Sequence, residues 1–443
     1  MWLWIVLAGC RLPDLNDGDG DGVDHQRDCD DTAPAIGERC PARCAIGWGP
    51  ILEEAPNADL AVPNAEDVAV LHVWSGADPE IGRRANDGRA RQPFADLGAA
   101  LQRAQEIGGP VVVAVSAGTY PVNASLYRES DTVAQGPRIV GCGPDEVIIE
   151  SGRPDRPVLD VRSQDLDPFD GIPATWSVKL RGVTVRGGRR AIRAVGSVDL
   201  AMQDVRVEGA GYYAVQGYGR QVRLGLTDVT VSGSIAYTAP FPGSLDLGVG
   251  VGALRGAIVE AERLTVDTAV GVGIVLAGDT RDGAKQRLDE VVVRDVSPTA
   301  GRLGRGVLAD GLMDLEITAL RVERVRDAAI WVRNAGAATL SNLVIDDVQP
   351  ASPPDGPADG VVLLQDAFDI VPSPFAYRVD TLTAVTDPER AAVVASGAVR
   401  VSAIDIDGQV IEEGLAEVSG EIPDPAPPLF ELDLEALPDD PPN

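Results

Sequence analysis

Short runs of alternating apolar and polar residues recur along most of the chain. From residue 183 onward, a motif of three residues with apolar first and third positions returns at spacings mostly of about 22 to 36 residues. The motif begins at Val183, Val205, Val229, Leu264, Val291, Leu320, Leu343, Leu382 and Ile404. An alternation of period two predicts β-strands, and its repetition along the chain predicts a solenoid built from stacked coils.

A second apolar strand pattern interleaves with the first. It begins at Ile192, Val215, Val251, Ile274, Val307, Ile330, Val361 and Val393. Each coil would therefore supply short parallel strands that bury their apolar faces only against neighbouring coils. No long helical periodicity exists after residue 107, which excludes a globular α/β fold.

The region before these repeats has a different pattern. Phe94, Leu97, Leu101, Ala104 and Ile107 share one stripe of a predicted helix, and apolar strands follow at 111–115, 139–140 and 147–149. This order, with Ser116-Ala117-Gly118-Thr119-Tyr120 after the first strand, resembles the N-terminal end of secreted proteins of the pectin-lyase-like class. The resemblance implies an all-β fold, a right-handed parallel β-helix solenoid of about 10 to 11 coils over residues 70–420, with an N-terminal capping helix.

Outward-facing charges of the first motif fall at equivalent places in successive coils. Arg186 is expected beside Glu208, and Arg294 between Asp267 and Glu323. Such opposite charges across strands stabilise a sheet and indicate structural ladders. Asp204, Asp228 and Asn342 precede the motif, where they are expected to satisfy the backbone of a bend and not to act as ligands.

The second motif places a continuous apolar stripe on the outside of the solenoid. Its members are Val275, Leu308, Trp331, Val362 and Val394. A monomeric soluble protein rarely leaves such a stripe open. Either loops or the C-terminal tail cover it, for which the alternating residues 430–434 are suited, or it is a partner or glycan surface centred on Trp331.

The charge balance narrows the class of partners. The chain has 68 acidic and 38 basic residues, a formal net charge of −30, and only 4% aromatic residues. Such a surface repels nucleic acid and attracts divalent cations, so we expect no nucleic-acid partner. A core of small and branched side chains, as in a stacked solenoid, suits this composition.

The N-terminus resembles the lipobox of bacterial lipoproteins. Residues 1–10 are apolar and end Leu7-Ala8-Gly9-Cys10. The resemblance implies acylation of Cys10, a membrane anchor, and an extracytoplasmic location at the outer membrane or cell surface. The segment lacks the positive region of a signal peptide, so we expect the true start codon upstream. The alternative is a buried N-terminal strand.

An Asp-rich stretch follows in the segment 11–45. Asp17, Asp19, Asp21, the backbone carbonyl of Val23 and Asp28 match the ligand spacing of a calcium loop, with Gly22 at the turn. The stretch resembles thrombospondin type 3 and dockerin-like calcium repeats, and Asp-rich segments of bacterial surface lipoproteins. A structural Ca²⁺ site that orders a stalk is therefore predicted; the alternative is a solvated acidic linker.

The cysteines and segment boundaries complete this picture. We expect a disulfide between Cys29 and Cys40, and a second, weaker pairing of Cys44 with Cys142. Residues 46–69 would link the stalk to the body, and residues 421–443 form an acidic, Pro-rich tail.

Catalytic motifs are scarce. The two histidines are His25 and His72, and the motifs of polygalacturonases and alginate epimerases are missing from the sequence. Asp310, Asp314 and Arg333 lie near one another in chain order, as many such trios do. The sequence therefore favours a membrane-anchored, non-catalytic binding protein for carbohydrate or a cell-surface partner. The alternative is a polysaccharide lyase or glycoside hydrolase on the same fold.

Overall fold

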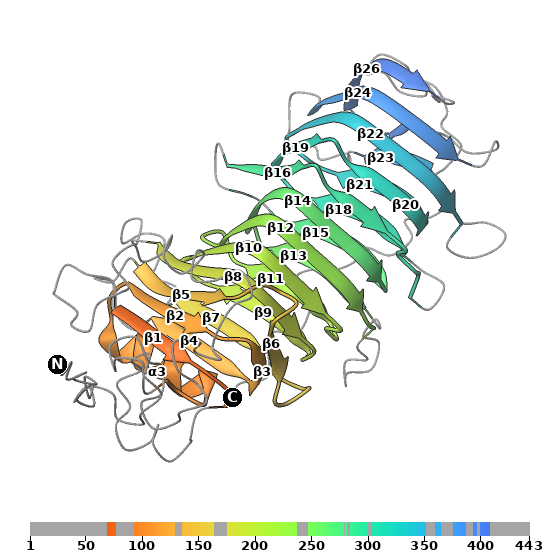
Figure 1. Cartoon of the computed structure of the whole chain (residues 1–443). Coiled ribbons are helices and arrows are strands. Elements are labelled where there is room, and N and C mark those ends of the chain that lie inside the picture. The colour runs from red at the N-terminus through yellow and green to blue at the C-terminus, as the bar shows by residue number, and fades with distance from the viewer. Residues whose placement is uncertain are drawn as a thin grey trace, which may run out of the picture.

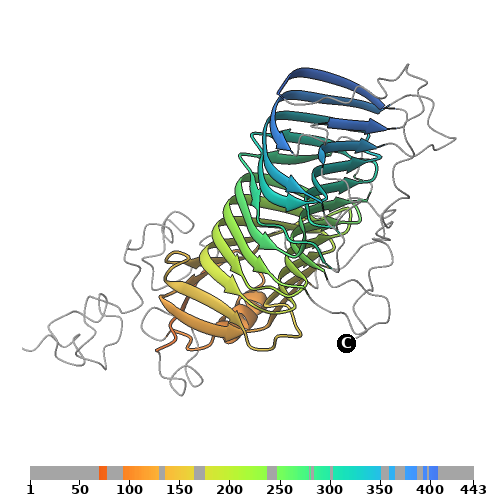
Figure 2. The same cartoon turned by 90° about the vertical axis from the view of Figure 1, so that its right-hand side faces the viewer.

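The computed structural model describes most of the predicted solenoid. The described residues are 69–76, 93–128, 135–163, 175–236, 247–278, 280, 284–299, 303–350, 359–364, 375–386, 393–396 and 399–407. Within them the chain winds into a stack of coils that runs from the N-terminal to the C-terminal strands (Figure 1). The view turned by 90° shows the same stack from the side (Figure 2).

The coils form two sheets whose strand pairs are all parallel. Ten strands form the first sheet, one from each of ten coils: β4 (Ala124–Arg128), β7 (Leu159–Ser163), β9 (Arg190–Val195), β11 (Tyr213–Tyr218), β13 (Gly248–Leu254), β15 (Gly271–Ala277), β18 (Arg305–Asp310), β21 (Ala328–Arg333), β23 (Asp359–Leu364) and β25 (Val393–Ser396). The fold is the predicted right-handed parallel β-helix, and ten of the described coils contribute strands to both sheets.

The second sheet has sixteen strands, because several coils contribute two. They are β1 (Ala69–Val73), β2 (Val111–Val115), β3 (Gly118–Val122), β5 (Gln135–Gly141), β6 (Val147–Ser151), β8 (Trp176–Arg186), β10 (Val198–Glu208), β12 (Arg223–Ser234), β14 (Ile258–Ala269), β16 (Lys285–Asp289), β17 (Val292–Arg294), β19 (Asp314–Thr318), β20 (Arg321–Arg326), β22 (Ala337–Gln349), β24 (Phe375–Thr386) and β26 (Val399–Asp407).

The predicted register is correct through most of the stack. In the ten-stranded sheet, Val215 lies opposite both Ile192 and Val251, and the row continues to Val393. Its inward members from Ile192 to Val393 are at most 2% exposed. The core is therefore a set of apolar columns along the solenoid axis, which period-two patterning encodes directly.

The prediction is wrong by two residues at the last coil. Leu382 lies opposite Ile406, whereas Ile404 lies opposite Asp380. A shift of two residues preserves the alternation of faces, so the apolar pattern alone does not exclude it. Asp405 then takes the place that Asp204 and Asp228 take in earlier coils.

A column of residues with positive φ bends the strands of the sixteen-stranded sheet. Gly182, Asp204, Asp228, Arg263, Glu290, Ala319 and Asn342 have φ between 51° and 62°. Asp and Asn adopt this left-handed conformation more readily than most residues. The predicted bend positions are therefore confirmed, whereas the expected hydrogen bonds between these side chains and the bend backbone stay a prediction. Asp228 also accepts hydrogen bonds from Arg263 at 2.6 and 3.1 Å.

A single described helix, α3 (Leu97–Ile107), packs at the N-terminal end of the stack (Figure 1). Asp96 caps its first turn by accepting a hydrogen bond from the Gly98 N–H at 2.8 Å, and Gly108 ends it in a left-handed conformation. Leu97 and Leu101 are buried, and the helix contacts β1 and β2. No helix among the described residues is both long and apolar enough to cross a membrane.

Candidate binding site

The five predicted stripe residues lie in one row on the outer face of the ten-stranded sheet. Val275 lies opposite Leu308, which lies opposite Trp331, and the row continues through Val362 to Val394. Val275, Leu308 and Val362 are only 2%, 4% and 4% exposed. Trp331 and Val394 are partly buried. At three of its five positions the stripe is thus a covered surface, and not an open one.

A second apolar cluster surrounds part of this row, outside the solenoid core. It contains Tyr212, Tyr213, Leu247, Val249, Leu254, Val272, Val275, Ala277, Leu303 and Leu308. The ring of Tyr213 lies over Gly252, where an added Cβ would come within 2.5 Å of Tyr213 Cε1. Glycine stands in the row at this point because the tyrosine ring occupies the space of a side chain.

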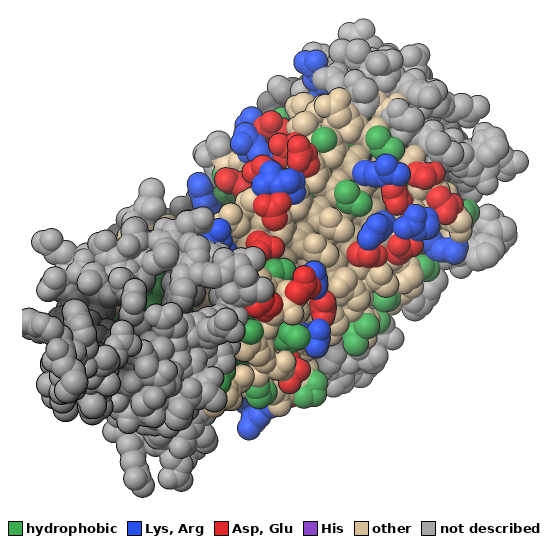
Figure 3. Space-filling view, viewed as in Figure 1, with side chains coloured by type: hydrophobic (Ala, Val, Ile, Leu, Met, Phe, Trp, Pro, Cys, Tyr) green, Lys and Arg blue, Asp and Glu red, His purple; other side chains and the backbone are tan. Residues whose placement is uncertain are grey.

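The outward face of the sixteen-stranded sheet differs from the apolar stripe in both exposure and composition. Figure 3 shows basic and acidic side chains next to one another over these strands. Arg186 donates to Glu208 at 2.9 and 3.0 Å, which confirms that predicted pair. Arg294 lies opposite Asp267 and Glu323. Among the described residues it forms a salt bridge only to Asp267, at 2.8 Å, while Glu323 pairs with Arg321 and Arg324. These charges neutralise one another and indicate stabilisation, not a binding site.

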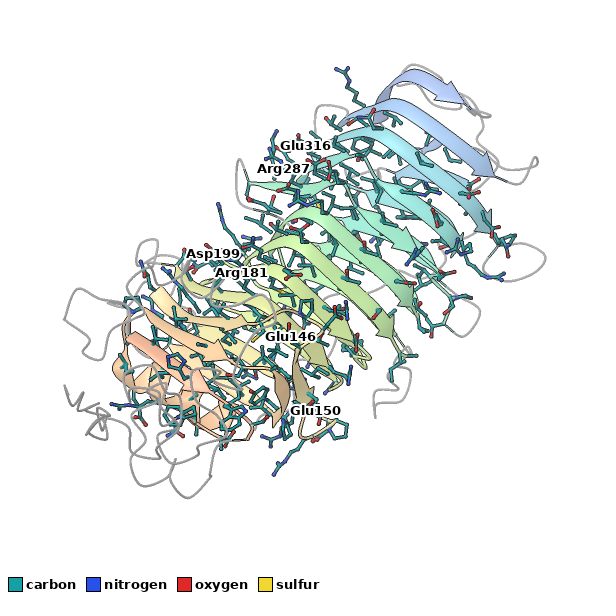
Figure 4. All side chains as sticks on the ribbon, viewed as in Figure 1. Glu146, Glu150, Arg181, Asp199, Arg287 and Glu316 are labelled. Carbon is teal, nitrogen blue, oxygen red and sulfur yellow. The ribbon has the colours of Figure 1, made fainter. Side chains whose placement is uncertain are left out.

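One carboxylate on that face has an altered pKa. Asp199 lies opposite Arg223, and burial raises the pKa of its carboxyl group, with Arg223 lowering it and Glu260 raising it. Farther along, Glu260 lies opposite Arg287, which is 3.6 Å from Glu316. Figure 4 shows Arg287 and Glu316 together, with Asp199 nearer the N-terminal end. Burial therefore favours the protonated form of Asp199, as it also does for Asp204.

A buried ion pair flanks the covered stripe near Trp331. Arg305 Nε lies 2.5 Å from Asp327 Oδ2, and both side chains are buried. The Arg305 guanidinium also lies 3.7 Å from the centroid of the Trp331 ring, in cation–π geometry. The pair fixes Trp331 against the sheet and leaves that ring little freedom to follow a ligand.

Toward the N-terminal coils the same outward row becomes polar. Asp160, Arg193 and Gln216 lie opposite one another on β7, β9 and β11. Arg162 contacts Asp160 Oδ2 at 2.6 and 2.8 Å, whereas Asp160 Oδ1 is buried and accepts no hydrogen bond within the described part of the chain. Gln216 Oε1 is also buried and accepts no hydrogen bond within the described part of the chain. Two buried acceptors without donors therefore lie in one row, two strands apart.

Tyrosine rings and a further arginine lie beside these acceptors. Tyr213 is opposite Arg190, and its ring meets Tyr212 edge to face at 4.6 Å between centroids. The Arg190 guanidinium lies 5.5 Å from the Tyr212 centroid. Burial raises the pKa of the Tyr212 phenol and raises that of Tyr213 still more, so both remain protonated at neutral pH. We call Asp160, Arg193, Tyr213 and Gln216 the polar site.

The described side chains do not form a recognisable metal site. The described residues contain no group of three or more His, Cys, Asp or Glu side chains placed to hold a metal ion. Burial lowers the pKa of His72 to about 4, which keeps it neutral at physiological pH. Asp310 and Arg333 pair at 2.8 and 3.0 Å in the ten-stranded sheet, but Asp314 lies in the other sheet, so that trio is not one site.

The predicted N-terminal sites lie outside the described residues. These are Cys10, the calcium ligands Asp17, Asp19, Asp21, Val23 and Asp28, and the cysteines Cys29, Cys40 and Cys44. Cys142 is described and 1% exposed, with its sulfur 3.6 Å from the Val115 carbonyl oxygen. Lipidation, the Ca²⁺ loop and both disulfides stay predictions.

Sequence patterning missed part of the polar site. Arg193 and Gln216 directly follow Ile192 and Val215, with which the second motif begins, so the motif predicts that both point outward. Asp160 lies before residue 183, where the motif assigns no register. The signal was present in the sequence: the stretch Leu159-Asp160-Val161 has the same apolar-polar-apolar pattern as Ile192-Arg193-Ala194, with which it pairs.

Comparisons with known proteins do not assign a family. No protein-family model and no curated protein matches the chain. Among solved structures, the catalytic unit of a GH87 α-1,3-glucanase from Streptomyces thermodiastaticus strain HF3-3 is similar at 13% identity, with a TM-score of 0.35 over 79% of this chain and 70% of that chain.

Two further solved structures give the same result. The catalytic domain of a GH87 α-1,3-glucanase in complex with nigerose matches at 10% identity and a TM-score of 0.33, over 78% of this chain and 70% of that one. The Agl-KA catalytic domain matches at 12% identity and 0.33, over 77% and 69%. Likeness at this level assigns neither an activity nor a family to this chain.

Proposed function

We propose that this chain is an extracytoplasmic, non-catalytic binding protein whose polar site takes carbohydrate. One observation carries the proposal: Asp160 Oδ1 and Gln216 Oε1 are buried acceptors without donors in a single outward row. An unsatisfied buried polar atom costs about 1–3 kcal/mol, so a ligand that donates hydrogen bonds to both gains that free energy on binding.

Saccharide hydroxyl groups fit this set of side chains. A hydroxyl group donates one hydrogen bond and accepts others, so it can pair with the Asp160 and Gln216 oxygens and with arginine N–H groups. Tyr213 adds an aromatic ring beside the same row. A few convergent polar groups next to apolar surface are typical of sites for small polar ligands.

The proposed location rests on the N-terminal sequence. Acylation of Cys10 would tether the chain to a bacterial membrane, and Ca²⁺ bound by Asp17, Asp19, Asp21, Val23 and Asp28 would order the segment between the tether and the solenoid. In this arrangement the solenoid carries its ligand surface outside the cytoplasm.

Co-sedimentation of the full chain carrying Cys10→Ser with insoluble neutral and acidic polysaccharides, in the presence of Ca²⁺, tests the proposal. Gln216→Leu keeps the side-chain volume and removes the acceptor, so it should weaken binding about tenfold. Gln203→Leu is the matched control, because Gln203 is an outward residue of the other sheet. Binding that Gln216→Leu leaves unchanged would place the ligand elsewhere, and no binding to any polysaccharide would leave a structural or protein-binding rod.

A carbohydrate-active enzyme is the second candidate function, and Asp199 is the observation that favours it. Burial raises the pKa of its carboxyl group, and Glu260 is close enough to raise it further. Two carboxyl groups of unlike protonation are what glycoside hydrolysis requires. Release of new reducing ends that is abolished by Asp199→Asn, but not by Asp289→Asn on the same sheet, would replace the binding proposal with this one.

A further inference from the structure

The outward row that carries the polar site begins on an exposed strand at the N-terminal end of the solenoid. This strand is β4, which ends the ten-stranded sheet and contacts α3 (Figure 1). Ser125 of β4 pairs with Asp160, and Tyr127 pairs with Arg162, so both side chains point outward as those of the polar site do. Ser125 is exposed, and Tyr127 is 43% exposed. The row is therefore open to solvent at this end.

The same row is closed at its other end. Gln216 is followed by Gly252, over which the buried ring of Tyr213 lies. Val275 and Leu308 come next in the row and are only 2% and 4% exposed. A ligand that enters over β4 can therefore extend along the row as far as Gln216, and the tyrosine ring stops it there.

The spacing of the two acceptors without donors indicates the length of this ligand. Asp160 and Gln216 lie two strands apart, and Ser125 and Gln216 lie three strands apart. At a strand spacing of about 4.8 Å, these separations are roughly 10 and 14 Å. A single pyranose ring, with bonds of about 1.5 Å, spans only roughly 6 Å between hydroxyl oxygens on opposite carbons. Linked rings lying along the solenoid axis thus match the row better than one ring does.

The chemistry of the row favours an uncharged ligand. Asp160 Oδ1 and Gln216 Oε1 accept no hydrogen bond within the described part of the chain, so each requires a donor. A sugar hydroxyl group supplies one, and a carboxylate group cannot. An ammonium group also donates, but Arg162 and Arg193 of the same surface repel a cation. Neutral sugars are therefore the class that fits.

The backbone around Tyr127 is fixed by a side chain of the capping helix. Gln105 of α3 accepts a hydrogen bond from the Tyr127 N–H at 2.9 Å and donates one to the Ser125 carbonyl oxygen at 3.3 Å. The amide group thus pairs with the free edge of β4 as a neighbouring strand would. A tyrosine ring combines an apolar face with a polar hydroxyl group, so an exposed one on a fixed strand is suited to stack against a sugar ring.

We propose that Ser125 and Tyr127 form an entry subsite, through which the polar site takes the end of a neutral glycan chain. The terminal ring donates to Gln216 Oε1 beside Tyr213, the next ring donates to Asp160 Oδ1, and a third ring stacks on Tyr127. The inference rests on the carbohydrate function proposed above and deepens it by naming the class of ligand and its direction.

Affinity electrophoresis of the full chain carrying Cys10→Ser, in gels that contain mannan, starch, dextran or laminarin, tests the entry subsite. Tyr127→Ala should weaken binding about tenfold, whereas Tyr127→Phe should preserve it because the ring remains. Val344→Ala is the matched control, because Val344 is 40% exposed at an outward position of the other sheet and should leave binding unchanged. Equal affinities for Tyr127→Ala and Val344→Ala would overturn the entry subsite.

Free competitors test whether the site takes chain ends. Each polysaccharide is offered intact and after partial acid hydrolysis, which at equal mass increases the number of chain ends. The hydrolysate should compete more strongly, in proportion to its number of ends, and equal competition would overturn the inference. Gln216→Leu separates the two proposals: binding that Gln216→Leu weakens but Tyr127→Ala does not would leave the carbohydrate function standing without the entry subsite. Binding to no polysaccharide would overturn both.

Discussion

Arg305 and Asp327 form an ion pair that is buried although it lies outside the apolar core of the solenoid. Their atoms Nε and Oδ2 are 2.5 Å apart, and their side chains are 6% and 3% exposed. Asp327 occupies a left-handed backbone conformation immediately before β21, and Arg305 begins β18 in the preceding coil. The pair therefore joins two adjacent coils where their strands β18 and β21 begin, and the Arg305 guanidinium also lies over the Trp331 ring.

Removal of the positive partner should destabilise the solenoid strongly. Arg305→Met leaves the Asp327 carboxylate buried without its counter-ion, for which we expect a loss of about 3–5 kcal/mol in the free energy of unfolding. Arg333→Met is the matched control, because its partner Asp310 has more access to water and the expected loss is about 1 kcal/mol. Urea unfolding followed by circular dichroism measures both; equal losses would contradict the assigned role of burial.

Gly252 should tolerate a methyl group far less well than Gly225. A Cβ at Gly252 would lie 2.5 Å from Tyr213 Cε1, while at Gly225 the nearest atom would be 3.9 Å away. Gly252→Ala therefore forces the buried Tyr213 ring to move, at an expected cost of about 1–3 kcal/mol. Gly225→Ala should be neutral or slightly stabilising, because alanine loses less conformational entropy on folding. Thermal unfolding of both variants decides the point, and a similar melting temperature for the two would argue against this packing.

Stability should fall with acidification through His72. Burial lowers the pKa of His72 from 6.5 to about 4, so between these pH values the unfolded chain binds a proton that the folded chain excludes. The folded state thus loses stability as pH falls through this window, by about 2 kcal/mol at pH 5 and roughly 3 kcal/mol below pH 4. His72→Gln should lose less stability between pH 7 and pH 5 than the wild type in urea unfolding. The same loss in both proteins would show that other groups account for the pH dependence.

The sequence predicted the solenoid because its physics is local and repetitive. Each inward column requires an apolar residue at every second position in every coil, so Ile192, Val215 and Val251 could be aligned without any structure. The predicted alignment of the last coil is wrong by two residues at Ile404, because a shift of two residues leaves the apolar alternation unchanged. Asp405 carried the missing information, because it directly precedes Ile406 as Asp204 precedes Val205 and Asp228 precedes Val229.

The candidate site was harder to predict, because burial on the outer face depends on what covers it. An outward Asp160 or Gln216 looks like any solvated polar residue in the sequence, and only the structure shows that one oxygen of each is buried without a donor. The Arg305–Asp327 pair, in contrast, has a spacing that can be recognised in the sequence. Its separation of 22 residues equals that of Arg186 and Glu208, which is the length of one short coil.

The Arg186–Glu208 pair should contribute little, in spite of its geometry. Arg186 donates two hydrogen bonds to Glu208, but the two side chains are 46% and 28% exposed, so water competes for both charges. A double-mutant cycle with Arg186→Met and Glu208→Gln should give a coupling energy of about 0.2–1 kcal/mol that decreases at 1 M salt. The corresponding cycle for Arg305 and Asp327 should give a larger coupling that salt changes little, because the pair is screened from solvent. A coupling at Arg186–Glu208 above about 2 kcal/mol would mean that the exposed ladders, and not the buried pair, hold adjacent coils in register.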